Sequence, residues 1–135
     1  MYLLDTIVVS ALRRPRPHGA VLKWFDSIAD EHLYISAVTI GELQAGIELT
    51  RQQDEAKAAA IERWLAEVTS TFSVIPMDDK MFSLWAKLMH RQSVTLYEDA
   101  MIAATAIVKN LTVVTRNTRD FEPFSVTVFN PFESE

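Results

Sequence analysis

The sequence contains no cysteine, and it has only three glycines and five prolines in 135 residues. Without cysteine the chain cannot form a disulfide, an iron–sulfur cluster or a cysteine-ligated zinc site. Its three histidines, His18, His32 and His90, do not have the spacing of metal ligands. Any metal in this protein would therefore be held mainly by oxygen atoms.

Long apolar runs and a basic excess are also absent. No run approaches the ~18 apolar residues that would suggest a membrane span. The N-terminal segment carries Asp5 inside its apolar part and arginines after it, which is the reverse of a signal peptide. We therefore expect a soluble, cytoplasmic protein. The formal net charge of −5 argues against a broad electrostatic nucleic-acid binder.

What the sequence does have is enough apolar residues, 49%, for one buried core, so we expect a single domain over residues 1–135. Short strand-like segments alternate with helical patterns along the chain. This alternation predicts an α/β fold in which helices cover both faces of a parallel sheet. The predicted strands are 2–5, 32–36, 73–78, 112–117 and 126–131, and the predicted helices are 17–29, 37–49, 52–72, 80–89 and 96–110, with a turn or short helix after residue 5.

Helical spacing also predicts which side chains are buried. Ser36 is a plausible N-cap for the second helix, and either Asp78 or Asp79 for the fourth. The third helix is strongly amphipathic. Residues expected to face the core include Val21, Leu22, Phe25 and Ile28 in the first helix, Ile61, Trp64, Leu65, Val68 and Phe72 in the third, and Phe82, Trp85, Leu88 and Met89 in the fourth.

Five polar residues fall where ligands bind in such folds, beyond the carboxyl ends of the strands. Asp5 ends the first predicted strand, and Glu42 lies early in the helix that follows the second. Asp99 begins a helix whose next residues are almost all apolar, and Asn117 and Asp120 follow the strand near residue 114. We expect four of these five side chains to face the same edge of the sheet.

Most of these acids, taken one at a time, have a simpler explanation. Asp99 and its neighbour Glu98 could cap a helix or sit in its first turn, where the helix dipole favours a negative charge. Asp5 could form a turn. Asp120 could pair with a nearby arginine, Arg116 or Arg119.

Glu42 is the hardest of the acids to explain structurally. No lysine or arginine occurs between Lys23 and Arg51, so an i,i+4 salt bridge cannot neutralise it. Several carboxylates at one sheet edge without a counter-charge would repel one another. A divalent cation relieves such repulsion, and carboxylate ligands with retained water suit Mg²⁺ or Mn²⁺.

A hard cation of this kind can activate water for attack on a phosphodiester. The predicted chemistry is therefore phosphodiester hydrolysis at the acidic edge of the sheet. Arginines would then contact a polyanionic substrate. The candidates are Arg13, Arg14, Arg16, Arg116 and Arg119.

Four separated motifs carry a family resemblance that covers essentially the whole chain. They are "LLDT" (3–6), "TIGEL" (39–43), "DAMIAATA" (99–106) and "VTRNTRDF" (114–121). In this order and at these intervals they resemble the PIN-domain ribonuclease toxins of the VapC type. The segments "PRPHGAVLKWFDS" and "VFNPF" are similar to the FitB-like branch of that group.

The resemblance implies a three-layer α/β/α PIN fold with a short central parallel sheet, and it assigns roles to residues. The counterparts of Asp5, Glu42 and Asp99 are the metal-binding acids of a magnesium- or manganese-dependent nuclease. The last motif supplies a fourth group, assigned here to Asp120, with Asn117 left open because relatives differ at this point. Thr6, Thr115 and Asn117 are expected to support the acids.

The same resemblance implies a biological setting. It predicts cleavage of RNA, inhibition of translation, and a co-expressed DNA-binding antitoxin whose tail inserts a basic side chain into the acidic pocket. A homodimer is expected, and operator DNA would be contacted only through the antitoxin.

The sequence departs from the family pattern at two positions. Ile7 stands where the family usually has Asn, and Ala11 where relatives often carry Glu. Loss of a residue that supports a metal ligand typically costs ~10–100-fold in affinity or activity. A catalytically weakened module that mainly binds the antitoxin is therefore an alternative, and a nuclease directed at DNA is another.

Overall fold

Five parallel strands form one sheet in the order β3-β2-β1-β4-β5. The structure is a computed structural model, and it describes residues 1–13 and 19–133. The predicted parallel sheet is confirmed, although the strands are shorter than the sequence indicated. They are β1 (Tyr2–Leu4), β2 (Leu33–Ser36), β3 (Ser73–Ile75), β4 (Thr112–Val114) and β5 (Val128–Phe129).

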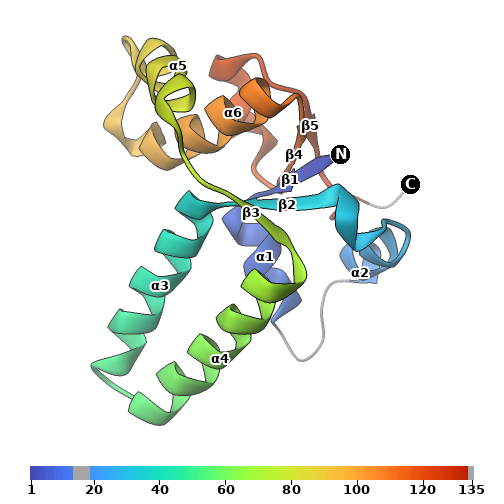
Figure 1. Cartoon of the computed structure of the whole chain (residues 1–135), viewed down its shortest axis with the longest axis vertical. Coiled ribbons are helices and arrows are strands. Elements are labelled where there is room, and N and C mark those ends of the chain that lie inside the picture. The colour runs from blue at the N-terminus through green and yellow to red at the C-terminus, as the bar shows by residue number, and fades with distance from the viewer. Residues whose placement is uncertain (14–18, 134–135) are drawn as a thin grey trace.

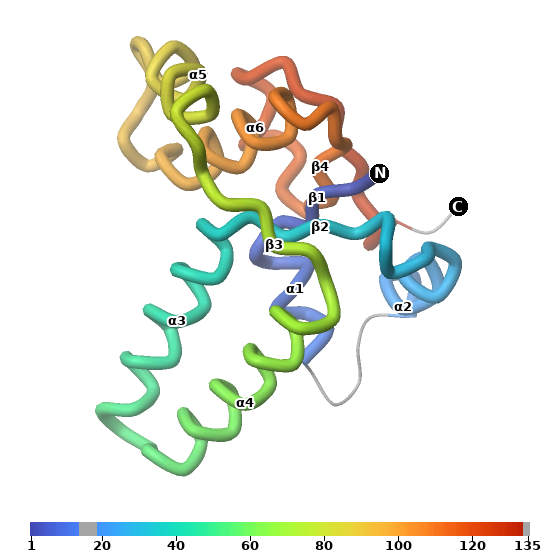
Figure 2. Tube along the Cα trace, viewed as in Figure 1, coloured from blue at the N-terminus to red at the C-terminus, as the bar shows by residue number. Residues whose placement is uncertain are grey.

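Helices cover both faces of this sheet, which confirms the three-layer α/β/α arrangement (Figure 1). One face carries α1 (Thr6–Leu12), α2 (Gly19–Asp26), α3 (Ala37–Arg51) and α4 (Glu55–Thr71). The other carries α5 (Asp79–Met89) and α6 (Tyr97–Lys109). Figure 2 shows β3 leading the chain from α4 on the first face to α5 on the second. Three short 3-10 helices complete the described part: η1 (Asp30–His32), η2 (Val94–Leu96) and η3 (Thr118–Phe124).

The central strands are mainly apolar because both faces of the sheet are covered. Successive side chains of a strand point to opposite faces. Leu3 and Val113 accordingly join the core under α5 and α6, whereas Leu4 and Val114 join the core under α1 to α4. All four side chains are completely buried. None of the helices in the described ranges is both long and apolar enough to cross a membrane.

Helix α6 is buried over its middle, as its sequence predicted, although Ile107 near its end is 39% exposed. Four alanines and Ile102 between Ala100 and Ala106 are inaccessible to solvent. Alanine side chains are short, so the helix can approach the sheet and its neighbours closely. This packing holds the first turn of α6, which carries Glu98 and Asp99, at a defined place above the sheet edge.

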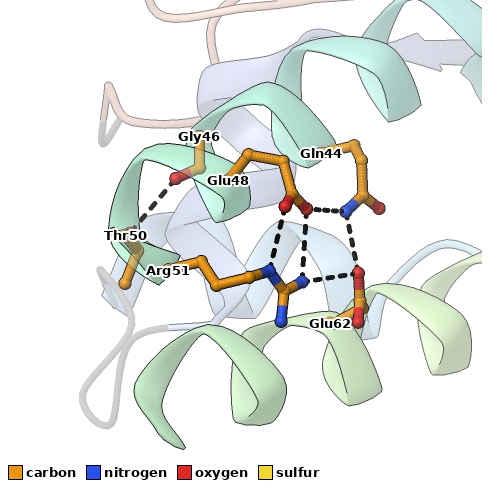
Figure 3. A network of polar contacts seen from close by, with 6 residues as sticks. All are labelled: Gln44, Gly46, Glu48, Thr50, Arg51 and Glu62. Carbon is orange, nitrogen blue, oxygen red and sulfur yellow. Dashed lines mark hydrogen bonds and ion pairs between the residues drawn. The ribbon is translucent and has the colours of Figure 1, made fainter. Parts of the chain in front are cut away.

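Helices α3 and α4 form a hairpin that projects away from the sheet (Figure 1). Ile47, Ala58 and Leu65 make the buried contact between them. Figure 3 shows a polar network over this contact, in which Arg51 pairs with Glu48 at 2.9 Å and with Glu62 at 3.0 Å. The amide of Gln44 donates to both glutamates at 2.8 Å. The network therefore joins the two helices without using any of the four predicted site acids.

Two predicted helix starts are decided by capping aspartates. Helix α4 begins at Glu55 rather than at residue 52, because Asp54 accepts a hydrogen bond from the backbone N–H of Lys57 at 3.0 Å. Asp78, not Asp79, caps α5 by accepting from the N–H of Met81 at 2.9 Å.

Two predictions of burial were wrong, at Phe82 and Leu22, which are 44% and 43% exposed. In α5 the completely buried residue is Met81. Neighbouring residues on a helix point about 100° apart, so Phe82 faces outward and meets Trp85 edge to face. In α2 Val21 is buried in the same way, one position before Leu22. That helix ends at Asp26 rather than near residue 29, and residues 17–18 of the predicted helix lie outside the described ranges.

Candidate active site

The strand order places a ligand site between β1 and β4. From β1 the chain builds the sheet outward through β2 to β3, and then returns to the other side of β1 to form β4 and β5. In open parallel sheets, ligands bind outside the carboxyl ends of the strands where the order reverses in this way. Asp5 directly follows β1, and Thr115 directly follows β4.

Asp5 is held by hydrogen bonds to both of its carboxylate oxygens. It is the N-cap of α1 and accepts from the backbone N–H of Thr6 at 2.9 Å through Oδ1. The hydroxyl of Thr115 donates to Oδ2 at 2.8 Å and in turn accepts from the backbone N–H of Asn117 at 3.0 Å. Asp5 is only 5% exposed, and burial raises the pKa of its carboxyl, although these hydrogen bonds oppose that shift. Asp5 therefore has a structural role as the cap of α1, and the same hydrogen bonds fix its carboxylate at the sheet edge.

Glu42 has no ion-pair partner among the described residues but is bound by a hydroxyl. The Thr6 hydroxyl donates to its Oε1 at 2.7 Å and lies 3.0 Å from the Thr39 hydroxyl. A hydroxyl has one proton, so while Thr6 donates to an ionised Glu42, Thr39 must donate to Thr6. Burial raises the pKa of the Glu42 carboxyl, the Thr6 hydrogen bond lowers it, and the charges of Asp5 and Glu98 raise it further.

Asp99 lies in the first turn of α6, but it does not cap that helix. The N-cap position is Leu96, which makes no side-chain capping bond. A capping interaction with an ionised carboxylate would lower its pKa. Instead, burial raises the pKa of the Asp99 carboxyl to about 7, and the charges of Asp5, Asp120, Glu42 and Glu98 add to this rise. Helix capping therefore does not account for this residue.

Asp120, in the first turn of η3, is not neutralised by either nearby arginine. The ion pairs within residues 1–13 and 19–133 are those of Arg51, so the alternative pairing of Asp120 with Arg116 or Arg119 is not formed there. Its charge raises the pKa of both Asp5 and Asp99. The guanidinium of Arg116 instead lies over the ring of Phe132, 4.6 Å from its centroid.

The structure thus brings Asp5, Glu42, Asp99 and Asp120 within electrostatic reach of one another, with Glu98 beside them. Even so, no group of three histidine or acidic side chains in the described ranges is arranged to hold a metal ion as it stands. Charges act over longer distances than the 2.0–2.6 Å of a ligand bond, so the two findings are compatible. Mg²⁺ commonly uses one or two carboxylates and keeps several waters, and an all-oxygen set of this kind suits it.

The other predicted site residues do not gather at one place. Arg116 lines a pocket together with Thr6, and Arg119 is exposed in η3. Arg13 ends α1, about 12 Å along the helix from Asp5 at 1.5 Å per residue. Asn117 is exposed and contributes its backbone N–H. Arg14 and Arg16 lie outside the described residues.

A larger cavity, of about 700 Å³, lies away from this acidic edge. Trp24, Phe129 and Pro131 are among its lining residues, and none of the four carboxylates is. The fold, the topology and the electrostatics all favour the acidic edge, so we take that edge as the candidate active site.

Comparison with known proteins agrees with this fold. The profile of the PIN domain matches residues 2–125. The chain belongs to the PIN domain family. This PIN domain is 35% identical to the toxin FitB of Neisseria gonorrhoeae, over 98% of this chain and 99% of that protein. It is 34% identical to the VapC ribonuclease Y4jK of Sinorhizobium fredii, with the same coverage of both chains. A solved structure of FitAB bound to an IR36 DNA fragment superposes with a TM-score of 0.85 at 32% identity, covering all of this chain and 98% of the other.

Sequence reasoning missed Thr39 as a site residue of this PIN domain. Thr39 is completely buried, and its hydroxyl lies behind Thr6 and Glu42. It stands three residues before Glu42 in α3, so both side chains fall on the same side of the helix. That spacing was available in the sequence, but the contact with Thr6 on α1 was not.

The raised pKa of Asp99 predicts a pH-dependent cost in stability. Between the ordinary value of 3.8 and about 7, folded Asp99 keeps a proton that the unfolded chain has lost. The free energy of unfolding should therefore fall as the pH rises through about 7. In EDTA we expect Asp99→Asn to melt a few degrees above the wild type at pH 8, and the difference to be smaller at pH 5. The shift in melting temperature is limited to a few degrees because solvent screens the charge of the half-buried Asp99.

Thermal melts from pH 5 to pH 8 measure this difference, and Asp79→Asn is a matched control because Asp79 is an exposed first-turn acid of α5. Equal, pH-independent melting of Asp99→Asn and the wild type would contradict the raised pKa that burial and the neighbouring acids give Asp99.

The hydroxyls of Thr39 and Thr6 and the carboxylate of Glu42 form a chain of hydrogen bonds, here called the relay, which predicts an effect on the pKa of Glu42. Thr39→Val removes the donor to Thr6 while keeping the side-chain shape, so Thr6 becomes a weaker donor and the pKa of Glu42 should rise further. We also expect a loss of about 1 kcal/mol in the free energy of unfolding. Thr39→Ser keeps the hydroxyl and should leave the Glu42 pKa near that of the wild type. Side-chain NMR titration of Glu42 in the three proteins is the measurement, and an unchanged pKa in Thr39→Val would rule out the relay.

Proposed function

We propose that this PIN domain, as a single-domain protein in the cytoplasm, is the toxin of a type II toxin–antitoxin system and hydrolyses RNA phosphodiester bonds with Mg²⁺ or Mn²⁺. One observation carries the proposal: four carboxylates gather at the β1/β4 edge without a counter-charge from the described residues, and the pKa of Asp99 rises to about 7. Supporting it, FitB is named a toxin and Y4jK a VapC ribonuclease.

In this proposal Asp5, Glu42, Asp99 and Asp120 hold the metal. A bound hard cation would supply a Lewis acid for the phosphate and lower the pKa of water. Thr115 and the backbone of Thr6 orient Asp5, whereas the hydroxyl of Thr6 orients Glu42. Asn117 keeps the Thr115 hydroxyl in place through its backbone N–H. Among the arginines, Arg116 is the best placed to contact the phosphate backbone of the substrate, because it adjoins Thr115 and lines a pocket with Thr6.

The partners follow from the same relatives. The FitAB structure contains that toxin's partner and a DNA fragment, which supports a cognate DNA-binding antitoxin for this chain and contact with operator DNA through that antitoxin. The acidic edge offers a basic side chain of the antitoxin a place to bind, as in the expectation from the sequence. A homodimer remains a prediction.

Ile7 bears on the alternative of a catalytically weakened module. Its side chain is 42% exposed, and both oxygens of Asp5 already accept hydrogen bonds from other residues. The aspartate is therefore oriented without help from position 7, which favours an active enzyme. The absence of a preformed group of three ligands in the described ranges favours the weakened module.

Cleavage of RNA separates these two proposals. With Mg²⁺ or Mn²⁺ and structured RNA, we expect the wild type to cleave and Asp5→Asn to lose on the order of 100-fold or more in rate. Asn can still cap α1, so the fold should survive. Asp26→Asn, a change of the same charge at an exposed site in α2, should cleave like the wild type. Gel assays would measure the rates. Equal cleavage by wild type and Asp5→Asn would remove the enzyme proposal, and a preference for deoxy substrates would redirect it to DNA.

Metal binding can be tested without activity. A cation that binds only the folded protein raises its stability by mass action, by about 1.4 kcal/mol for each tenfold concentration above the dissociation constant. We therefore expect the melting temperature to rise with Mg²⁺ at constant ionic strength, and Asp99→Asn to show a much smaller rise. The same response in both proteins would mean that the carboxylates do not hold the ion.

A further inference from the structure

A second cavity adjoins the acidic edge and has a different chemistry. Its volume is about 270 Å³, just below the range of pockets that take drug-sized ligands. One wall is a single face of α1, and the other comes from the segments after β4 and β5. The lining residues are Thr6, Ile7, Ser10, Ala11, Arg116 and Phe132.

The pocket and the carboxylates share a wall. Thr6 lines the pocket and, at the same time, binds Asp5 through its backbone N–H and Glu42 through its hydroxyl. Arg116 follows Thr115, whose hydroxyl holds the other oxygen of Asp5. A molecule whose phosphate lies at the carboxylates would therefore have its adjoining group at this pocket.

The walls suit a flat aromatic group next to a phosphate. Ile7 and Ala11 are apolar, and Arg116 is the one charged residue among the lining residues. The Phe132 ring lies under its guanidinium, 4.6 Å from centroid to Cζ, which favours a fixed plane for that group through a cation–π contact. Unstacked RNA bases stack on aromatic rings and on guanidinium planes of this kind.

We propose that this pocket binds the base of the nucleotide next to the scissile phosphate, with Ile7 and Ala11 as its apolar wall and Arg116, held by Phe132, as its stacking platform. This inference rests on the proposed ribonuclease function and assigns the base preference of cleavage to these residues. The resemblance to VapC-type toxins marks Ile7 and Ala11 as departures from the usual pattern. Their apolar side chains form a wall of this pocket that a base can contact.

Binding tests the proposal separately from cleavage. Labelled RNA tetranucleotides that differ at one base are titrated in EDTA into the wild type and the variants, and dissociation constants are measured by fluorescence anisotropy. The wild type should bind purine over pyrimidine at one position by about fivefold, as stacking predicts. Ile7→Asn puts a polar group in the wall, and Arg116→Lys keeps the charge but loses the plane. In both variants the preference should fall below about twofold.

Ile107→Asn is the matched control, because Ile107 is also an exposed isoleucine on a helix, 39% against 42% for Ile7, and does not line the pocket. It should keep the wild-type preference. Cleavage sites in a random RNA pool, mapped with Mg²⁺, should show the same base bias in the wild type and in Ile107→Asn, and a weaker bias in the two pocket variants.

The outcomes distinguish the two proposals. If no protein cleaves but the base preference in binding depends on Ile7 and Arg116, the pocket inference stands and the ribonuclease proposal falls. If cleavage occurs with the same base bias in every variant, or if the wild type binds none of the tetranucleotides, the pocket inference is overturned. It is also overturned if Ile7→Asn weakens only the binding of the co-expressed antitoxin and leaves RNA binding unchanged.

Discussion

The hydrogen bond from Thr115 to Asp5 joins the ends of the two strands between which the sheet reverses its order. It is made at 2.8 Å between residues 110 positions apart in the sequence. Asp5 also caps α1, so the same carboxylate ends β1, begins the helix and faces the site. The positions of Thr6 and Glu42 are set relative to this point, since Thr6 follows Asp5 in the chain and Glu42 is bound to Thr6.

Around this junction the protein uses hydroxyl and backbone N–H donors rather than cations to hold its acids. Neutral donors orient a carboxylate without cancelling its charge, so the acids remain available to a cation from solution. The cost is the burial of charged groups and, to a smaller extent, their mutual repulsion, and both raise the pKa values of Asp5, Glu42 and Asp99. The alanine-rich packing of α6 resists that repulsion by keeping Asp99 in place. A lower free energy of unfolding, caused by charged groups at the site, is typical of functional regions.

Arg116, the residue after Thr115, is also kept apart from the acids. Arg116 adjoins the site, yet its guanidinium lies over Phe132 and forms no ion pair with a carboxylate of the described residues. A ring partner holds the plane of an arginine while leaving its charge and its donors free for a phosphate. By contrast, the ion-paired Arg51 joins α3 to α4 and serves the fold alone (Figure 3).

The sequence by itself determined the alternation of strands and helices, the burial of α6 and the isolation of Glu42 from local basic residues. These follow from periodicity and spacing, which act over a few residues. It also singled out four acids as candidates, through their places at predicted strand ends and helix starts and through their motifs; their role as metal ligands stays a prediction. It was less able to fix which helix face is buried: in α5 the residue it placed in the core was Phe82, whereas the structure buries Met81.

Only the tertiary structure decided which side chains meet. The pairing of Thr115 with Asp5, the relay from Thr39 through Thr6, and the pocket between α1 and Phe132 all join segments that are distant in the chain. Such contacts depend on the order of the strands in the sheet, which local preferences do not encode. The pKa of Asp99 likewise depends on burial and on charges from three other elements, so no property of residues 96–110 alone could have given it.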